Sequence, residues 1–165
     1  MFKIYTSGGI QRRRDGGRRW RVLLDKFARR CKLDIEFVHP PDTVNPDFSL
    51  RTDNQLLYDN PTAWYKKHES VELEDLRRVR ESDANVFYYD GNTGFGTDRE
   101  FLEAYNGNKP IYFIRTVPKT SVQHWVMWRV LHLKDTSPDR LRTFTSLPEF
   151  RDFLKVHFPA GGKKP

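Results

Sequence analysis

Two acidic residues, Asp75 and Glu100, are the side chains of this chain whose types and placement suggest chemistry. Glu100 lies on the first turn of a helix-like run that follows the turn Gly94-Phe95-Gly96-Thr97. Asp75 lies on the helix-like run before the strand-like Asn85–Tyr89. A glycine-rich turn after a strand lets the backbone approach a ligand, and the helix behind it directs free N–H groups at that ligand.

Such a pair of carboxyl groups suits the cleavage of a bond between a sugar and a base. The transition state carries positive charge on the anomeric carbon, which one carboxylate can attack or stabilise. The second carboxyl group handles the proton of the leaving base. The simpler interpretation is that both side chains are solvated, as Asp and Glu on helices usually are. Glu100 and Asp75 are therefore candidate catalytic residues.

Strand-like and helix-like segments alternate along the chain. Runs of β-branched and aromatic residues predict strands at Lys3–Thr6, Leu33–Val38, Asn85–Tyr89, Ile111–Arg115 and Leu141–Thr145. Apolar spacing and capping signals predict helices at Arg18–Cys31, Ser70–Ser82 and Thr97–Tyr105, and after Ser146. In the second of these, Ser70 is the expected N-cap, and the expected inward stripe is Leu73, Leu76 and Val79. The segment Val122–Leu133 fits a helix or a strand.

This alternation predicts an α/β fold with a doubly wound parallel sheet of the Rossmann or flavodoxin type and helices on both faces. We expect one domain over residues 1–158 and a flexible tail over 159–165. Ligands of such sheets bind beyond the carboxyl ends of the strands. Three segments converge there: Ser7-Gly8-Gly9, Asp90 to Gly96, and the chain from Arg115 onward.

The long polar segment Asp42–Lys67 has two interpretations. It forms a cover over the site, or a surface insertion packed by its own aromatic residues. In the first case, one residue of the pair Trp64-Tyr65 stacks on the substrate, and we take Trp64 as the candidate.

Composition narrows the function classes. The net charge of +7, with 29 Lys and Arg against 22 Asp and Glu, allows a nucleic-acid partner or solvated helix faces with one anion-attracting loop. The single Cys31 excludes an internal disulfide, and no run of about 18 apolar residues or signal peptide is visible. We expect a cytoplasmic protein. Scattered histidines and the absence of a P-loop or dinucleotide fingerprint predict no metal and no cofactor.

Five short motifs in order resemble the nucleoside 2-deoxyribosyltransferase family, including its nucleoside 5′-monophosphate N-glycosidase branch. They are the opening strand and loop Lys3-Ile4-Tyr5-Thr6-Ser7-Gly8-Gly9, the pair Trp20-Arg21, the segment Asp75-Leu76-x-x-Val79-x-x-Ser82-Asp83-Ala84, the motif Gly96-Thr97-x-x-Glu100-x-x-x-Ala104, and Lys109-Pro110-Ile111. The similarity covers most of residues 2–115 and, more loosely, the final strand and helix.

The resemblance implies roles for these residues. Glu100 aligns with the nucleophile that forms a covalent ribosyl-enzyme intermediate, and Asp75 with the acid that assists departure of the base. The substrate-binding residues that it implies, together with those at the strand ends, are Ser7, Gly8, Gly9, Asp90, Gly94, Gly96, Thr97 and Trp64. Subunits of this family often complete each other's pockets, so the resemblance also implies a homodimer or larger homo-oligomer.

The sequence departs from the family at two positions. Gly94 stands where the transferases often carry Asp and the monophosphate hydrolases often carry Ser, and Thr93 or Thr97 is the candidate to supply a hydroxyl group instead. Leu102 stands where the family usually has Gly.

The leading hypothesis is cleavage of the N-glycosidic bond of a nucleoside or nucleoside 5′-monophosphate, by hydrolysis or base transfer. We favour the monophosphate hydrolase slightly, because the basic loop Arg12–Arg19 follows the first strand closely, although that loop equally suits a solvated helix start. The alternatives are a non-catalytic nucleotide- or nucleic-acid-binding module on the same fold and a glycohydrolase of the NAD type.

Overall fold

The computed structural model describes residues 1–9, 15, 17–40, 58–91 and 93–160. Its strands are β1 (Phe2–Gly8), β2 (Ile35–Val38), β3 (Ala84–Tyr89), β4 (Ile111–Arg115) and β5 (Leu141–Phe144). The helices described here are α1 (Arg18–Arg30), α3 (Pro61–Glu81), α4 (Phe95–Asn106), α5 (His124–Thr136) and α6 (Leu147–His157), with 3₁₀ turns η2 (Lys119–Ser121) and η3 (Pro138–Arg140).

The described strands form one five-stranded sheet in the order β2-β1-β3-β4-β5. All four neighbouring pairs are parallel. This order confirms the predicted α/β class as a flavodoxin-like fold, in which the chain winds outward in both directions from the central β1 and β3.

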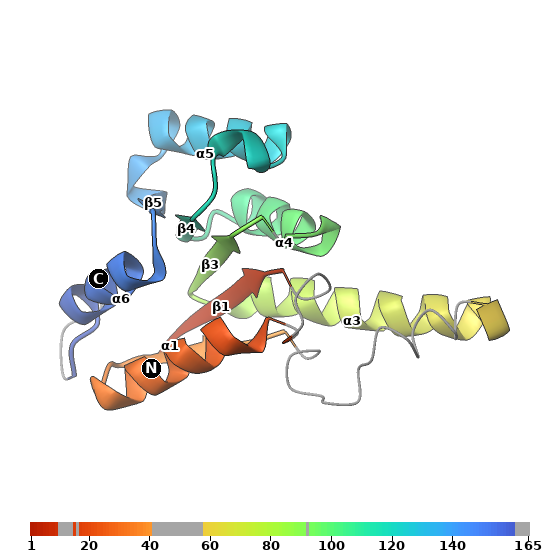
Figure 1. The fold of residues 1–165 in the computed structure, drawn as a ribbon, viewed down its shortest axis with the longest axis horizontal. Helices are drawn as coiled ribbons and strands as arrows, with labels where there is room; N and C mark the ends of the chain where they lie inside the picture. Colours follow the sequence, from red (N-terminus) through yellow and green to blue (C-terminus); the bar gives the residue numbers. More distant parts are fainter. Residues whose placement is uncertain (10–14, 16, 41–57, 92, 161–165) are drawn as a thin grey trace.

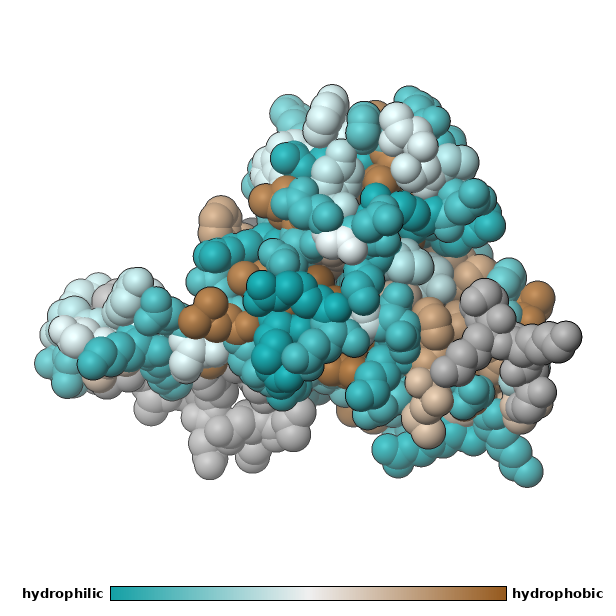
Figure 2. Space-filling view, turned by 180° about the vertical axis from the view of Figure 1, so that it is seen from behind, coloured by the Kyte–Doolittle hydropathy of each residue, from teal (hydrophilic) through white to brown (hydrophobic). Residues whose placement is uncertain are grey.

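Helices cover both faces of the sheet (Figure 1). One core cluster joins the sheet to α1 and α6, with Trp20, Phe27, Phe150 and Leu154 among its members. The other joins the opposite face to α3, α4 and α5. The face seen from behind is covered mainly by hydrophilic residues (Figure 2). The apolar side chains of the two core clusters are buried between the layers. Of the helices that the structure describes, none is long and apolar enough to cross a membrane.

Helix α3 is longer than the sequence analysis predicted. It begins at Pro61, where the Asn60 side chain accepts a hydrogen bond from the Ala63 N–H at 3.0 Å. Asn at the N-cap followed by Pro at the first position is a strong start signal that the prediction of Ser70 as N-cap overlooked. Ser70 instead lies inside the helix and donates its hydroxyl to the Lys67 carbonyl.

Two other expectations about α3 need correction. Leu73 was expected on the inward stripe, but its side chain is exposed, whereas Leu76 and Val79 are buried as predicted. The segment Asp42–Lys67 was expected as a cover or insertion; residues 58–67 contain the start of α3, and 41–57 lie outside the described residues. Figure 1 shows that α3 runs well past the edge of the sheet.

The remaining elements follow the predictions with shifted ends. The ambiguous Val122–Leu133 segment contains α5, whose buried residues Val126, Val130 and Leu133 recur at helical spacing. Strand β1 extends through Ser7 and Gly8, which were expected in a turn. The expected mobile tail falls largely on residues 161–165, outside the described residues.

Gly8 is required by close packing between β1, α1 and β3. A Cβ atom at this position would lie 3.1 Å from the Trp20 ring and 3.1 Å from the Tyr88 carbonyl oxygen. Neither the Tyr88 backbone nor the buried Trp20 ring can shift without a loss of packing. A side chain at Gly8 therefore forces the strand or the helix to move.

We therefore predict that Gly8→Ala lowers the free energy of unfolding by about 1–3 kcal/mol, measured by urea denaturation. Gly96→Ala is the matched control, because a Cβ there meets nothing within 4 Å. Alanine in a helix should leave stability unchanged or raise it by up to about 1 kcal/mol. Equal stability of the two variants would contradict this account of Gly8.

Candidate active site

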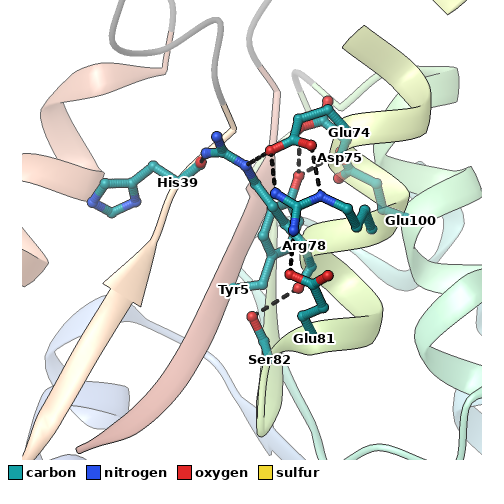
Figure 3. A network of polar contacts seen from close by, with 9 residues as sticks. Tyr5, His39, Glu74, Asp75, Arg78, Glu81, Ser82 and Glu100 are labelled. Carbon is teal, nitrogen blue, oxygen red and sulfur yellow. Dashed lines mark hydrogen bonds and ion pairs between the residues drawn. The ribbon is translucent and has the colours of Figure 1, made fainter. Parts of the chain in front are cut away.

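Asp75 and Glu100 lie on either side of one tyrosine hydroxyl. The Tyr5 Oη atom of β1 is 2.9 Å from Glu100 Oε1 on α4 and 3.1 Å from Asp75 Oδ1 on α3 (Figure 3). Three elements far apart in the sequence thus bring two carboxyl groups to one point beside the sheet. Glu100 is 8 % exposed and Asp75 is half-buried.

Tyr5 keeps its proton over the ordinary pH range. Burial raises the pKa of its hydroxyl well above the usual value, and negative charge on the neighbouring Glu100 raises it further. The hydroxyl therefore remains available as a hydrogen-bond donor between the two acids.

Ser7 supplies a second donor to Glu100. Its hydroxyl donates to Glu100 Oε2, while Tyr5 reaches Oε1. Tyr5 and Ser7 are two residues apart on β1, so their side chains point to the same face of the sheet. Both carboxylate oxygens of a nearly buried glutamate are thereby hydrogen-bonded, which is the condition for holding a carboxylate inside a protein.

Contacts between α3 and α4 fix the separation of the two acids. Arg99 pairs with Glu72, and Arg80 lies 3.6 Å from Glu103, so ion pairs cross between the helices on both sides of the acids. Beneath them, Phe101 of α4 packs edge-on against Phe87 of β3, with ring centroids 5.2 Å apart.

The opposite face of β1 is anchored by a buried arginine. Arg21, 1 % exposed, donates to the carbonyl oxygens of Thr6, Gly8 and Gly17 and to the Thr6 hydroxyl, at 2.9–3.3 Å. These bonds join the end of β1 to the start of α1. Gly17 has a φ of +69°, and a Cβ there would lie 2.6 Å from Arg21 Nη1, so only glycine fits.

A histidine after β2 extends this anchor. His39 Nδ1 lies 2.7 Å from Thr6 Oγ1, and His39 Nε2 lies 3.0 Å from Asp25 Oδ2 of α1. The His39 carbonyl accepts from Arg78 of α3 at 2.6 Å, and Arg78 also pairs with Glu74, one residue before Asp75 (Figure 3). The site is therefore supported by α1, β2 and α3 together.

The other predicted site residues lie around the carboxyl ends of β1 and β3. Gly9 is buried just after β1, and Asp90 is half-buried just after β3. Gly94 is the N-cap of α4 and has no side chain that could cap the helix. Gly96 is exposed, whereas Thr97 is buried on the core-facing side of the helix. Of the two candidate hydroxyls, Thr93 is half-buried before α4.

Trp64 does not lie in a loop, as the sequence analysis assumed. It lies in the first part of α3, and its ring packs against His68 one turn further on, with centroids 4.1 Å apart. Its role in substrate binding stays a prediction.

Sequence reasoning missed a second carboxylate–tyrosine pair. The Tyr89 hydroxyl, at the end of β3, donates to Asp98 Oδ1 at 2.8 Å. Asp98 is 6 % exposed, and burial raises its pKa, although the Tyr89 bond acts in the opposite direction. Sequence reasoning also missed the Tyr5 hydroxyl, because tyrosines on strands pack in the core. The signal available was spacing: Tyr5 lies two residues from Ser7, and Tyr89 two residues from Phe87, which places each pair on one face of its strand.

Solved structures with this fold give the arrangement a context. The 2-deoxyribosyltransferase from Leishmania mexicana superposes with a TM-score of 0.58 at 14% identity, covering 96% of this chain and 100% of its own. The 2-deoxyribosyltransferase from Bacillus psychrosaccharolyticus gives 0.56 at 14% identity, covering 91% and 90%. The chain has the fold of the 2-deoxyribosyltransferases.

A conserved protein from Enterococcus faecalis V583 shares this fold as well, with a TM-score of 0.54 at 16% identity over 94% of this chain and 98% of its own. No protein-family model and no curated protein matches the sequence. The resemblance noted in the sequence is therefore confirmed for the deoxyribosyltransferase-like fold, which spans nearly the whole chain.

The raised pKa of Asp98 predicts a pH dependence of stability. Because ionising this carboxyl group is harder in the folded protein than in the unfolded chain, its contribution is full below the unfolded value of about 3.9 and is lost as pH rises through the folded value. We expect the unfolding free energy of Asp98→Asn minus that of the wild type to increase from pH 3 to pH 7.

Urea denaturation at several pH values measures this difference. Asp135→Asn, which changes an exposed aspartate of α5, is the control, and its difference from the wild type should vary less with pH. A difference for Asp98→Asn that decreases toward neutral pH would show that Asp98 is stabilised as a carboxylate in the folded protein.

Proposed function

We propose that this chain cleaves the N-glycosidic bond of a nucleoside or nucleoside 5′-monophosphate, with Glu100 as nucleophile and Asp75 as general acid. The observation that supports it most strongly is the Tyr5 hydroxyl between the two carboxyl groups. A reaction that needs one ionised and one protonated carboxyl group is best served by a site that holds two such groups in unlike states.

The hydrogen-bond pattern supports unlike protonation states for the two acids. A phenol carries one proton, so Tyr5 cannot donate to Glu100 and Asp75 at the same time. Glu100 also accepts from Ser7, so both of its oxygens are hydrogen-bonded, which favours its ionised form. The assignment we propose is that the Tyr5 hydroxyl donates its hydrogen bond to Glu100 and accepts a hydrogen bond from a protonated Asp75.

These states fit the first half of the reaction. A Glu100 oxygen forms a bond to the anomeric carbon while the bond from that carbon to the base nitrogen breaks. The electron pair of the broken bond stays on the base, which takes the proton of Asp75. The products are a glycosyl ester on Glu100, a neutral base and an ionised Asp75.

In the second half, water or a second base attacks the anomeric carbon and releases the Glu100 carboxylate. Asp75 takes up the proton that the attacking group loses, which restores the starting state. Tyr5 stays protonated throughout and can turn its hydroxyl toward whichever carboxyl group is charged.

Preference for hydrolysis of monophosphates over base transfer is the finer part of the proposal. Arg18 and Arg19 at the start of α1 lie close in sequence to the end of β1, whereas Arg12, Arg13 and Arg14 lie outside the described residues. Helix α4 begins at Phe95, and its N-cap Gly94 has no side chain to cap it, so its first N–H groups are open to a polar ligand. Completion of the pocket by a second copy of the chain stays a prediction.

The proposal is tested by incubating the protein with ribo- and deoxyribonucleosides, their 5′-monophosphates and NAD, and measuring free base by chromatography. We expect base release from one nucleoside or nucleotide class, and at least about a 10³-fold lower rate for Glu100→Ala. Release only in the presence of an acceptor base indicates a transferase. No release from any substrate, combined with salt-sensitive DNA binding, would favour the nucleic-acid-binding alternative.

The role of Asp75 predicts a dependence on the leaving group. Asp75→Asn removes the proton that a departing base needs, so turnover of the natural substrate should fall by about 10²-fold or more. In a 4-nitrophenyl glycoside of the same sugar, the leaving group is 4-nitrophenolate, which departs without protonation. The rate at which Asp75→Asn releases 4-nitrophenolate should therefore change far less. An equal loss for both substrates would contradict the general-acid role.

A further inference from the structure

Asp98 is a buried carboxylate that the proposed reaction does not use. It lies on the first turn of α4, two residues before Glu100, and is 6 % exposed. Its carboxylate accepts a hydrogen bond from the Tyr89 hydroxyl at 2.8 Å. Burying a carboxyl group costs free energy of folding, so we expect Asp98 to have a structural or functional role at this position.

Asp98 and Glu100 flank the core-facing side of the same helix turn. Residues two apart are separated by about 200° around a helix axis, and the buried Thr97, Phe101 and Ala104 lie between them. Glu100 reaches Tyr5 and Ser7 on β1. Asp98 reaches β3, the strand paired with β1.

The start of α4 has few other attachments. Its N-cap Gly94 makes no side-chain hydrogen bond, Phe95 is 80% exposed, and a Cβ at Gly96 would touch nothing within 4 Å. Toward α3 this turn is held by the exposed ion pair of Arg99 with Glu72, and toward the sheet by the buried Thr97 and the two carboxylates. Of the two, Glu100 must leave its donors when it attacks a substrate, whereas Asp98 does not.

We propose that Tyr89 and Asp98 are positioning residues that hold the first turn of α4 in place, so that Glu100 faces Asp75 before and during the reaction. This inference rests on the proposed function. Tyr89 is itself firmly placed, because it is 1 % exposed and its ring packs on Phe113 with centroids 5.0 Å apart. Its hydroxyl keeps its proton, since burial and the Asp98 charge raise its pKa well above the usual value.

The test compares Tyr89→Phe and Asp98→Ala with the wild type in base release. We expect each to lower kcat by about 10-fold or more with little change in KM, because a small misplacement of a reacting group is costly while the pocket is intact. The double variant should be no slower than the slower single variant. Asp98→Asn keeps an oxygen acceptor for Tyr89, and should retain near wild-type kcat.

Tyr112→Phe is the matched control, since it removes a hydroxyl from a buried tyrosine of β4 on the opposite face of the sheet. The carboxyl-carbon NMR resonance of Glu100 gives a readout that needs no turnover. It should move in Tyr89→Phe and stay in Tyr112→Phe. If the wild type releases no base, the proposed function fails, and this resonance alone decides the inference.

Two results would overturn the positioning role. One is a Tyr89→Phe variant with unchanged kcat and an unmoved Glu100 resonance. The other is a loss of activity in Asp98→Asn as large as that in Asp98→Ala, because it would tie activity to the charge of Asp98 rather than to its bond with Tyr89.

Discussion

The hydrogen bond that the site depends on is the one from the Tyr5 hydroxyl, which lies between two carboxyl groups. Two acids brought together in a partly buried place repel one another if both are charged, so one tends to keep its proton. A single phenol proton between them makes the two groups unequal. The proposed reaction needs this inequality, because one group must attack the sugar while the other protonates the departing base.

Strand β1 carries the side chains that meet this requirement, and it is held from both faces. Tyr5 and Ser7 point to α3 and α4, while Thr6 between them points to Arg21 and His39 on the other side. The strand is therefore fixed from both faces, by hydroxyl–carboxylate bonds on one and by a buried guanidinium on the other. Parallel pairing with β3 then places Tyr89 beside the same helix, where it bonds Asp98.

Much of this arrangement could be predicted from the sequence, since strand–helix alternation and glycine-rich strand ends specify an α/β sheet and where its ligands bind. The pairing of Asp75 with Glu100 followed from the resemblance and from their places before and after one strand. The start of α3 was missed because the aromatic, polar stretch around Trp64 concealed the Asn60-Pro61 signal. The importance of Tyr5 and Tyr89 was missed because a buried ring and a buried hydroxyl give the same sequence pattern.

The central claim is that Glu100 forms a covalent bond to the sugar. The most direct measurement is peptide mass spectrometry of the protein quenched with acid during turnover of the substrate whose base it releases. The account predicts a mass increase of one glycosyl or phosphoglycosyl group, located on Glu100 and absent in Glu100→Ala. Rapid base release with no such adduct, or with the adduct on another residue, would contradict the assignment of Glu100 as the nucleophile.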